Sequence, residues 1–183
     1  MTWRLLLEEP ADLAAQELNN YMNWPEYFFR HVYLVASKSK DPRTKIGSVL
    51  VRDNRIIASG YNGFAAGVED CEERYNNHGL KLKLVVHSEA NSILQCALLG
   101  LSSKDAVLYT SGLPCHECSK SIIQAGISKV VIHKQWPNLI HSEKWVESCR
   151  ISKMMLDEAE VEIEEFDGKL GLVGLLDGKE IEI

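Results

Sequence analysis

The chain has 183 residues, of which 45% are hydrophobic and 25% charged, a balance typical of one soluble globular domain. Its 26 acidic and 20 basic side chains give a formal net charge of −6, which argues against a long nucleic acid as ligand, because polyanion binding needs a basic face. A single nucleotide, which needs only one or two local cations, remains open.

Five cysteines form an odd set without a regular disulfide framework: Cys71, Cys96, Cys115, Cys118 and Cys149. Such a set suits a reducing compartment and thiolate ligands better than disulfides. Leu5-Leu6-Leu7 is followed at once by acidic residues, unlike a signal peptide. No apolar run approaches the ~20 residues of a membrane span. We therefore expect a cytoplasmic protein.

The first third of the chain predicts two helices and a hairpin. Apolar positions at helical spacing predict a helix over 9–22, and Trp24-Pro25, with proline in the first turn, begins a second helix that ends near Ser37. The β-branched runs 46–51 and 55–59 predict an antiparallel hairpin.

The segments before and after this hairpin have compositions typical of loops. Residues 37–45 are polar with four basic side chains, so they are either a solvated connection or a phosphate site. Residues 60–67 hold three glycines, which indicates irregular backbone and close approach to another part of the structure. The charged, weakly periodic stretch 68–84 is long for a connector, and such loops tend to be lids or binding loops.

The remainder alternates between helices and strands. Helices are predicted over 88–100, 115–125 and from about 141 or 142 to 159, and strands over 107–110, 129–132 and 161–164. In the first of these helices Ala90, Ile93, Leu94, Ala97 and Leu98 are the expected core positions, and in the last Trp145 is one of them.

This order of elements predicts a three-layer α/β fold, with a five-stranded mixed β-sheet flanked by helices on both faces. We expect a single domain over 1–183, with a core at about 24–165 and an N-terminal helix at 9–22. The tail 166–183 has Asp-Gly turns between short apolar runs and could add a terminal hairpin.

Potential metal ligands stand at the starts of two predicted helices. His87 precedes one helix, and Cys115 and Cys118, preceded by Pro114, begin the next. A lone histidine is more often structural, and a Cys-x-x-Cys pair can be a redox pair. Together, however, His-x-Glu and Pro-Cys-x-x-Cys match the zinc-deaminase signature, in which three ligands leave a fourth position for water. We therefore predict Zn²⁺ as the cofactor.

The spare carboxylate of this motif is Glu89, two residues after His87. It could serve only as a favourable charge at a helix N-terminus. Zinc, however, lowers the pKa of a bound water from about 16 to about 7. Glu89 could then carry the proton from that water to a ring nitrogen and on to a leaving amine, and we favour this catalytic role if zinc is present.

Several further segments, in the same order, resemble the deoxycytidylate deaminases of the cytidine deaminase superfamily. They are Ser39–Pro42, Lys45–Gly47, Gly60–Gly63, Leu82–Val86 and Ile122–Ile127. The zinc motif specifies only the superfamily, whereas Ser-Lys-Asp-Pro and Gly-Tyr-Asn-Gly favour a free deoxynucleotide monophosphate. The resemblance implies a cytidine-deaminase-like fold and hydrolytic deamination of dCMP to dUMP in deoxypyrimidine nucleotide metabolism.

Carried onto matching positions, the resemblance also implies substrate contacts. Asn62 would hydrogen-bond the sugar 3′-hydroxyl, Ile46 would pack on the base, and the backbone near Ser88 would read the pyrimidine edge. Arg43 and Lys45 are candidates for the phosphate, with ordinary surface cations as an equal alternative.

Trp136 could close over the nucleotide, although a packed tryptophan is an equal alternative. Relatives that match the Gly-Tyr-Asn-Gly region are often hexamers activated by dCTP and inhibited by dTTP. The resemblance therefore implies a homo-oligomer whose effectors bind at Tyr61, Gly63, Phe64 and Gly67. We expect neither a long nucleic acid nor a membrane as partner.

The chain departs from the family where Ser88 replaces the usual alanine between the zinc histidine and the glutamate. The added hydroxyl could alter the pocket and admit a modified cytosine. Two alternatives stay open: a deaminase of another free cytosine nucleotide or of 5-substituted dCMP, and a non-catalytic, zinc-stabilised binding module.

Overall fold

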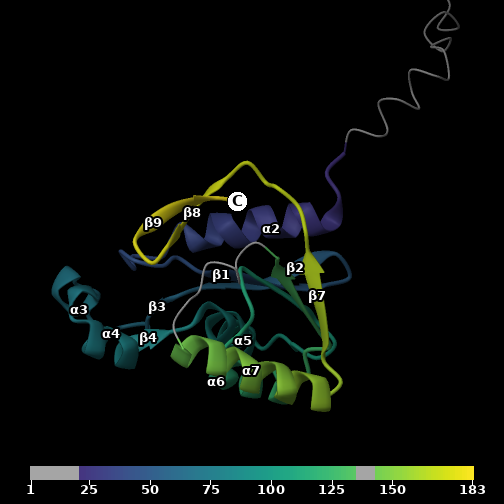
Figure 1. The fold of residues 1–183 in the computed structure, drawn as a ribbon. Coiled ribbons are helices and arrows are strands. Elements are labelled where there is room, and N and C mark those ends of the chain that lie inside the picture. The colour runs from purple at the N-terminus through teal and green to yellow at the C-terminus, as the bar shows by residue number, and fades with distance from the viewer. Residues whose placement is uncertain (1–20, 135–142) are drawn as a thin grey trace, which may run out of the picture.

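The structure is a computed structural model that describes residues 21–134 and 143–183 (Figure 1). Its helices are α2 (Trp24–Ala36), α3 (Glu72–Asn76), α4 (His78–Leu84), α5 (Ser88–Leu99), α6 (His116–Gln124) and α7 (Glu143–Glu158). Its strands are β1 (Gly47–Arg52), β2 (Arg55–Tyr61), β3 (Gly63–Phe64), β4 (Val85–Val86), β5 (Val107–Thr110), β6 (Lys129–His133), β7 (Glu162–Phe166), β8 (Val173–Leu176) and β9 (Lys179–Glu182). The helix predicted over 9–22 lies almost entirely outside the described residues.

Five strands form the central sheet in the order β2-β1-β5-β6-β7. Strand β1 is antiparallel to β2 and β5, whereas β5, β6 and β7 run parallel, so the sheet is mixed. Helix α2 covers one face, and α5, α6 and α7 lie on the other (Figure 1). The predicted three-layer α/β fold with a five-stranded mixed sheet is confirmed.

Alternation along β1 supplies both hydrophobic cores. Val49 and Val51 belong to the core under α2, with Phe28 and Phe29, whereas Leu50 belongs to the core on the opposite face. Successive side chains of a strand point to opposite faces, so one short apolar run serves two layers.

Helix α2 begins where its sequence predicts. The Asn23 side chain accepts a hydrogen bond from the Glu26 backbone N–H at 2.9 Å, and Pro25 occupies the first turn, where no N–H is needed.

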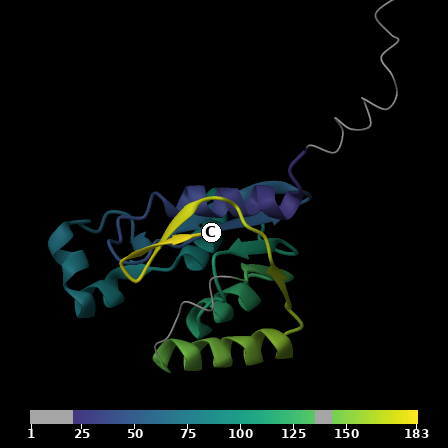
Figure 2. The same ribbon diagram turned by 45° about the horizontal axis from the view of Figure 1, so that its top comes forward.

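The C-terminal segment forms the predicted hairpin. Strands β8 and β9 are antiparallel and joined by Asp177 and Gly178, which both have positive φ, as a two-residue hairpin turn requires. Figure 2 shows this hairpin on the same side of the sheet as α2, and Leu176 contributes to the core there.

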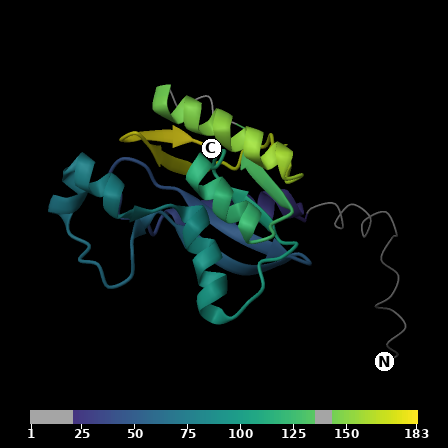
Figure 3. The ribbon, with the colours of Figure 1, turned by 90° about the horizontal axis from the view of Figure 1, so that it is seen from below.

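The stretch 68–84 differs from the expected loop. It contains α3 and α4, while β3 pairs with β4 across its base. Figure 3 shows the two helices projecting beside the main body of the structure. Each is too short to show an apolar repeat, so sequence periodicity could not reveal them.

Helix α5 has the predicted bounds and ends at Gly100 in the left-handed conformation. The expectation that Leu94 and Leu98 are core positions is wrong, because they are 57% and 84% exposed. The buried residues of α5 are instead Ser88, Glu89, Ser92 and Cys96. The helix therefore turns a face of small and polar side chains toward the sheet.

Gly60 explains this orientation. A Cβ atom at Gly60 would lie 2.2 Å from the Ser88 carbonyl oxygen and 2.5 Å from the Ser92 nitrogen. Strand β2 therefore runs directly against the backbone of the first turns of α5. The close approach expected for the glycine-rich segment is confirmed at this position.

His133, at the end of β6, is buried and links this strand to α2 and to the segment that follows β7. Its Nδ1 lies 2.8 Å from the Tyr33 hydroxyl, and its Nε2 lies 2.8 Å from the Gly168 carbonyl oxygen. Because a carbonyl only accepts, Nε2 carries the proton and Nδ1 accepts from Tyr33. Burial lowers the pKa of His133, so the imidazole is neutral in the folded protein.

The described residues contain no helix that is both long and apolar enough to cross a membrane.

Gly60→Ala should destabilise the protein by about 1–3 kcal/mol, the usual cost of overpacking, because its new methyl group would meet backbone atoms of α5. The measurement is thermal unfolding followed by circular dichroism. Gly79→Ala in α4 is the control, because the nearest atom to its added Cβ is Asn77 Oδ1, 3.9 Å away. Equal melting temperatures for the two variants would contradict the close packing of β2 against α5 at Gly60.

Protonation of His133 should make stability depend on pH. In the unfolded chain the pKa of His133 is about 6.5, whereas burial lowers it in the folded protein. Below pH 6.5 the unfolded state therefore binds a proton that the folded state does not bind, so the free energy of unfolding decreases as the pH falls. The slope for one proton approaches about 1.4 kcal/mol per pH unit. Between pH 8 and pH 5, His133→Gln should lose less stability than the unsubstituted chain in urea titrations, and parallel curves would refute this role.

Candidate functional site

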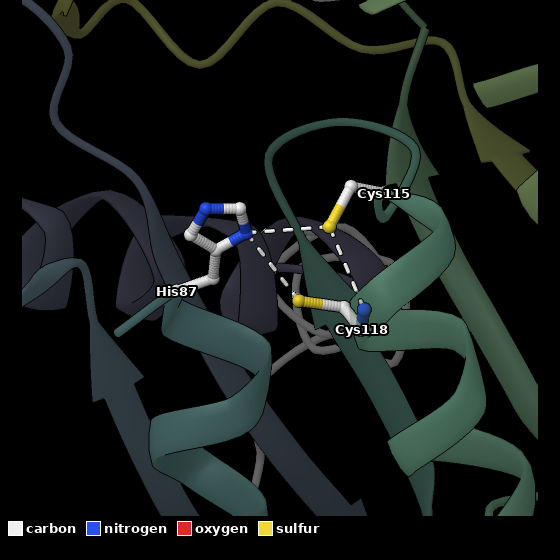
Figure 4. Close-up of side chains that lie close together, drawn as sticks. All are labelled: His87, Cys115 and Cys118. Atoms are coloured by element: carbon white, nitrogen blue, oxygen red, sulfur yellow. Dashed lines mark hydrogen bonds between the residues drawn. The ribbon is translucent and has the colours of Figure 1, made fainter. Parts of the chain in front are cut away.

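Three ligand atoms converge between the starts of α5 and α6 (Figure 4). The Nδ1 atom of His87 lies 3.4 Å from Cys115 Sγ and 3.5 Å from Cys118 Sγ. His87 is the N-cap residue of α5 and Cys115 that of α6, so each helix presents its N-terminus to the cluster. In the part of the chain that the structure describes, this is the only group of three or more side chains able to hold a metal.

The protonation of this cluster fits a divalent cation. Hydrogen bonds from Cys118 and His87 lower the pKa of Cys115 to about 4, whereas the bond with Cys115 and burial raise the pKa of Cys118. The bond to Cys115 also raises the pKa of His87 to about 9. The lowered pKa of Cys115 makes it the group of this cluster that ionises most readily. A Zn²⁺ ion bound here would favour the deprotonated form of all three ligands.

Glu89 lies beside this cluster and is only 6% exposed. The Ser88 hydroxyl donates a hydrogen bond to Glu89 Oε2 at 2.9 Å, which orients the carboxyl group. Burial raises the pKa of Glu89, and the nearby His87 charge opposes that shift. A carboxyl group whose pKa moves toward neutrality is suited to accept and return a proton.

A cavity of about 830 Å³ opens over these residues, which is within the range of small-molecule sites. Among the residues lining it are Asp41, Arg43, Thr44, Ile46, Asn62, His78, Lys81, His87, Ser88, Glu89, Leu113, Lys144, Trp145, Leu176 and Asp177. The structure thus brings the predicted zinc ligand His87 and the predicted proton carrier Glu89 together with the substrate candidates Arg43, Ile46, Asn62 and Ser88. Lys45 is not among the lining residues, and Trp136 lies outside the described part of the chain.

Asn62 is buried and holds the loop that forms one wall. Its Oδ1 accepts from the Ile46 N–H at 2.8 Å, and its Nδ2 donates to the Thr44 carbonyl oxygen at 2.8 Å. Each polar atom of the amide can make a second hydrogen bond. Asn62 can therefore support the wall and still contact a ligand.

The C-terminal hairpin supports the same loop from outside. The Arg43 guanidinium pairs with the Asp177 carboxylate, the Gly178 N–H donates to the Arg43 carbonyl oxygen at 2.7 Å, and the Lys45 N–H donates to the Leu175 carbonyl oxygen at 2.9 Å. The two proposed phosphate residues are thus held in place by a segment that the sequence presents as an added tail.

Sequence reasoning did not assign most of the other lining residues, among them Trp145, Lys81 and Asp177. Trp145 was expected in the core, yet it lines the cavity with its ring centroid 6.5 Å from that of His87. Lys81 lies in a stretch without a recognisable motif, and the Asp-Gly turn that contains Asp177 gives no sign of a place near the cavity. The only sequence signal was the unusual length of the 68–84 stretch, which indicates a binding loop.

The predicted effector residues are not among the lining residues of the cavity, although Tyr61 and Gly63 flank the lining residue Asn62 in the chain. Tyr61 is 40% exposed, Gly63 pairs with Val86, and Gly67 has a positive φ of 81°. Phe64 stacks on Tyr75 with ring centroids 4.4 Å apart.

Residues 22–134 match the family model of the cytidine and deoxycytidylate deaminase zinc-binding region. The chain belongs to this family. ComE operon protein 2 of Bacillus subtilis is 34% identical over 86% of this chain and 85% of its own length. A probable deoxycytidylate deaminase of Drosophila melanogaster is 39% identical over 83% of each chain.

A solved structure matches this member of the deaminase family along most of its length. The dCMP deaminase of the cyanophage S-TIM5, in complex with dCMP and dUMP, is 25% identical and superposes with a TM-score of 0.60. The match covers 80% of this chain and all of that one. Family membership makes the chain a hydrolytic deaminase with a zinc-binding region.

Cys118→Ala should abolish stoichiometric zinc binding, because it leaves only two of the three protein ligands that a catalytic zinc site needs. The purified unsubstituted protein should hold about one zinc per chain by elemental analysis. Cys149→Ser, which changes a half-buried thiol of α7 outside the ligand cluster, is the control and should keep its zinc. Zinc retained by the Cys118 variant would show that the metal binds elsewhere.

Proposed function

We propose that this deaminase catalyses the zinc-dependent hydrolysis of dCMP to dUMP and ammonia. The observation that carries the proposal is the position of the buried Glu89 beside the His87, Cys115 and Cys118 ligand set, within a cavity that also contains Asn62 and Arg43. The similarity to a dCMP deaminase bound to dCMP and dUMP supports the same substrate class.

In this proposal His87 Nδ1, Cys115 Sγ and Cys118 Sγ hold the zinc. The metal would make hydroxide available at neutral pH by lowering the pKa of water. Glu89 would take one proton from the attacking water and deliver it to the ring nitrogen next to C4, where it stays in the product. It would then take the second proton, from the hydroxyl group formed on C4, and pass it to the amine, which departs as ammonia while C4 becomes a carbonyl. The Ser88 hydroxyl keeps the Glu89 carboxyl group oriented during these transfers. One water is consumed and one ammonia is released.

The remaining contacts position the nucleotide. We assign the sugar 3′-hydroxyl to the free hydrogen-bonding capacity of Asn62, and the base to a slot that includes Ile46 and Trp145. Arg43 lines the cavity, and its guanidinium group could leave the Asp177 carboxylate to bind the phosphate. Lys45 stabilises the same loop through the hydrogen bond from its backbone N–H to the Leu175 carbonyl oxygen. Trp136 remains our candidate for a residue that closes over the nucleotide.

We also propose, on the resemblance, a homo-oligomer activated by dCTP and inhibited by dTTP. The support in this structure is connectivity: the effector candidates Gly63 and Phe64 form β3, which pairs with β4, and β4 is followed directly by His87. Rates with each triphosphate, together with light scattering, test this part. An unchanged rate with both triphosphates would remove it and leave the catalytic proposal intact.

Ser88 bears on the choice of cytosine. Its side chain is fully buried and its hydroxyl is bonded to Glu89, so the substitution for alanine is accounted for without a modified base. This favours unsubstituted dCMP over 5-substituted dCMP. Comparing dCMP, 5-methyl-dCMP, CMP and dCTP as substrates decides between these nucleotides.

Glu89→Gln should reduce ammonia release from dCMP by about 10²- to 10⁴-fold, because the amide cannot transfer the proton. The variant should retain zinc and its melting temperature, since Glu89 is not a member of the ligand set. Ammonia release by a coupled assay, with metal analysis on the same samples, provides the test. Undiminished ammonia release by Glu89→Gln would contradict its role in proton transfer. No ammonia release from the unsubstituted, zinc-loaded protein would support the alternative of a non-catalytic zinc module.

A further inference from the structure

A buried ion pair lies in the wall of the cavity, outside the catalytic group. Lys81, on α4, places its Nζ 2.8 Å from Asp41 Oδ2, and the two side chains are 8% and 4% exposed. Lysine is rarely buried to this extent, because removing its charge from water is costly. Both residues line the same cavity as Glu89, so this cost is incurred where a ligand would bind.

Asp41 is fixed from several sides and therefore fixes Lys81. Its Oδ1 accepts from the backbone N–H groups of Arg43 and Thr44 at 2.9 and 3.2 Å. The Asp41 N–H donates to Ser39 Oγ at 3.2 Å, and that hydroxyl donates to the Asn62 carbonyl oxygen at 2.7 Å. The lysine partner is thus built into the loop that Asn62 holds.

The ammonium group retains capacity for a ligand. It has three N–H donors, and within the described residues Asp41 Oδ2 is its acceptor. Two other residues with a permanent positive charge line the cavity: Arg43 is half exposed and already paired with Asp177, and Lys144 is exposed. Lys81 is therefore the best shielded of these three cations, and a shielded charge interacts more strongly with an anion than an exposed one does.

We propose that Lys81 binds the 5′-phosphate of the substrate and that Asp41 positions it for this contact. The inference rests on the proposed function, since it assigns the phosphate of the same nucleotide. In this assignment Glu89 acts at the base, Asn62 contacts the sugar and Lys81 binds the phosphate. All three residues line the same cavity. The pair then makes the enzyme prefer the monophosphate to the nucleoside.

The test compares Lys81→Met with Lys83→Met, an exposed lysine on the same helix that does not line the cavity. The measured quantity is the ratio of kcat/KM for dCMP to kcat/KM for deoxycytidine. A charge-assisted hydrogen bond is worth about 1.5–3 kcal/mol, so this ratio should fall about 10- to 150-fold in the Lys81 variant, through KM. Lys83→Met should keep the ratio of the unsubstituted enzyme.

A second variant separates phosphate binding from folding. Lys81→Met leaves the Asp41 carboxylate buried and unpaired, whereas Asp41→Asn combined with Lys81→Gln removes both charges and keeps a hydrogen bond. Melting temperatures identify which variants are folded. A purely structural pair predicts equal losses on dCMP and deoxycytidine, so an unchanged ratio in the folded variant would overturn the inference.

Titration with the product keeps the two proposals apart. Calorimetric affinities for dUMP and deoxyuridine should show that Lys81→Met weakens dUMP binding by a similar factor, about 10- to 150-fold, and leaves deoxyuridine binding less affected. If the unsubstituted enzyme released no ammonia from dCMP, the proposed function would fail while these titrations still decide the role of Lys81. Equal dUMP affinities for the Lys81 and Lys83 variants would overturn that role even in an active dCMP deaminase.

Discussion

The contact between Gly60 of β2 and the first turns of α5 determines where the chemistry can occur. These turns carry Ser88 and Glu89 and follow directly on His87. The depth at which α5 sits therefore sets the position of the proposed proton carrier and of one proposed zinc ligand together. A glycine in the strand and small side chains on the helix allow backbone to approach backbone. The unusual polarity of the buried face of α5 follows from this packing.

A second set of constraints comes from the polar wall of the cavity. Asp41 and Asn62 use their side chains to hold backbone groups of residues 43–46, in place of the regular pairing that a strand would supply. Buried polar groups of this kind are stable only when each finds its partner. The loop is consequently rigid enough to position a ligand while presenting side chains that a strand could not bring together.

The sequence was most informative where the signal is local. The start of α2 at Trp24-Pro25, the end of α5 at Gly100 and the Asp-Gly turn of the C-terminal hairpin each depend on a few adjacent residues. The structure forms each of them as predicted. Leu94 was misassigned because an apolar repeat shows that a helix has two faces but not which one a glycine-bearing strand will contact. Trp145 and Lys81 could not be placed, since their surroundings are built by segments distant in sequence.

The attachment of the C-terminal hairpin to the Arg43 loop has a consequence for biosynthesis. Arg43 and Asp177 are separated by 134 positions, whereas the last of the three proposed zinc ligands is Cys118. At a translation rate of ~5–20 residues per second, roughly 3 to 12 seconds pass between synthesis of Cys118 and of Asp177. A nascent chain can therefore gather its metal ligands while the loop at the cavity rim still lacks its outer support.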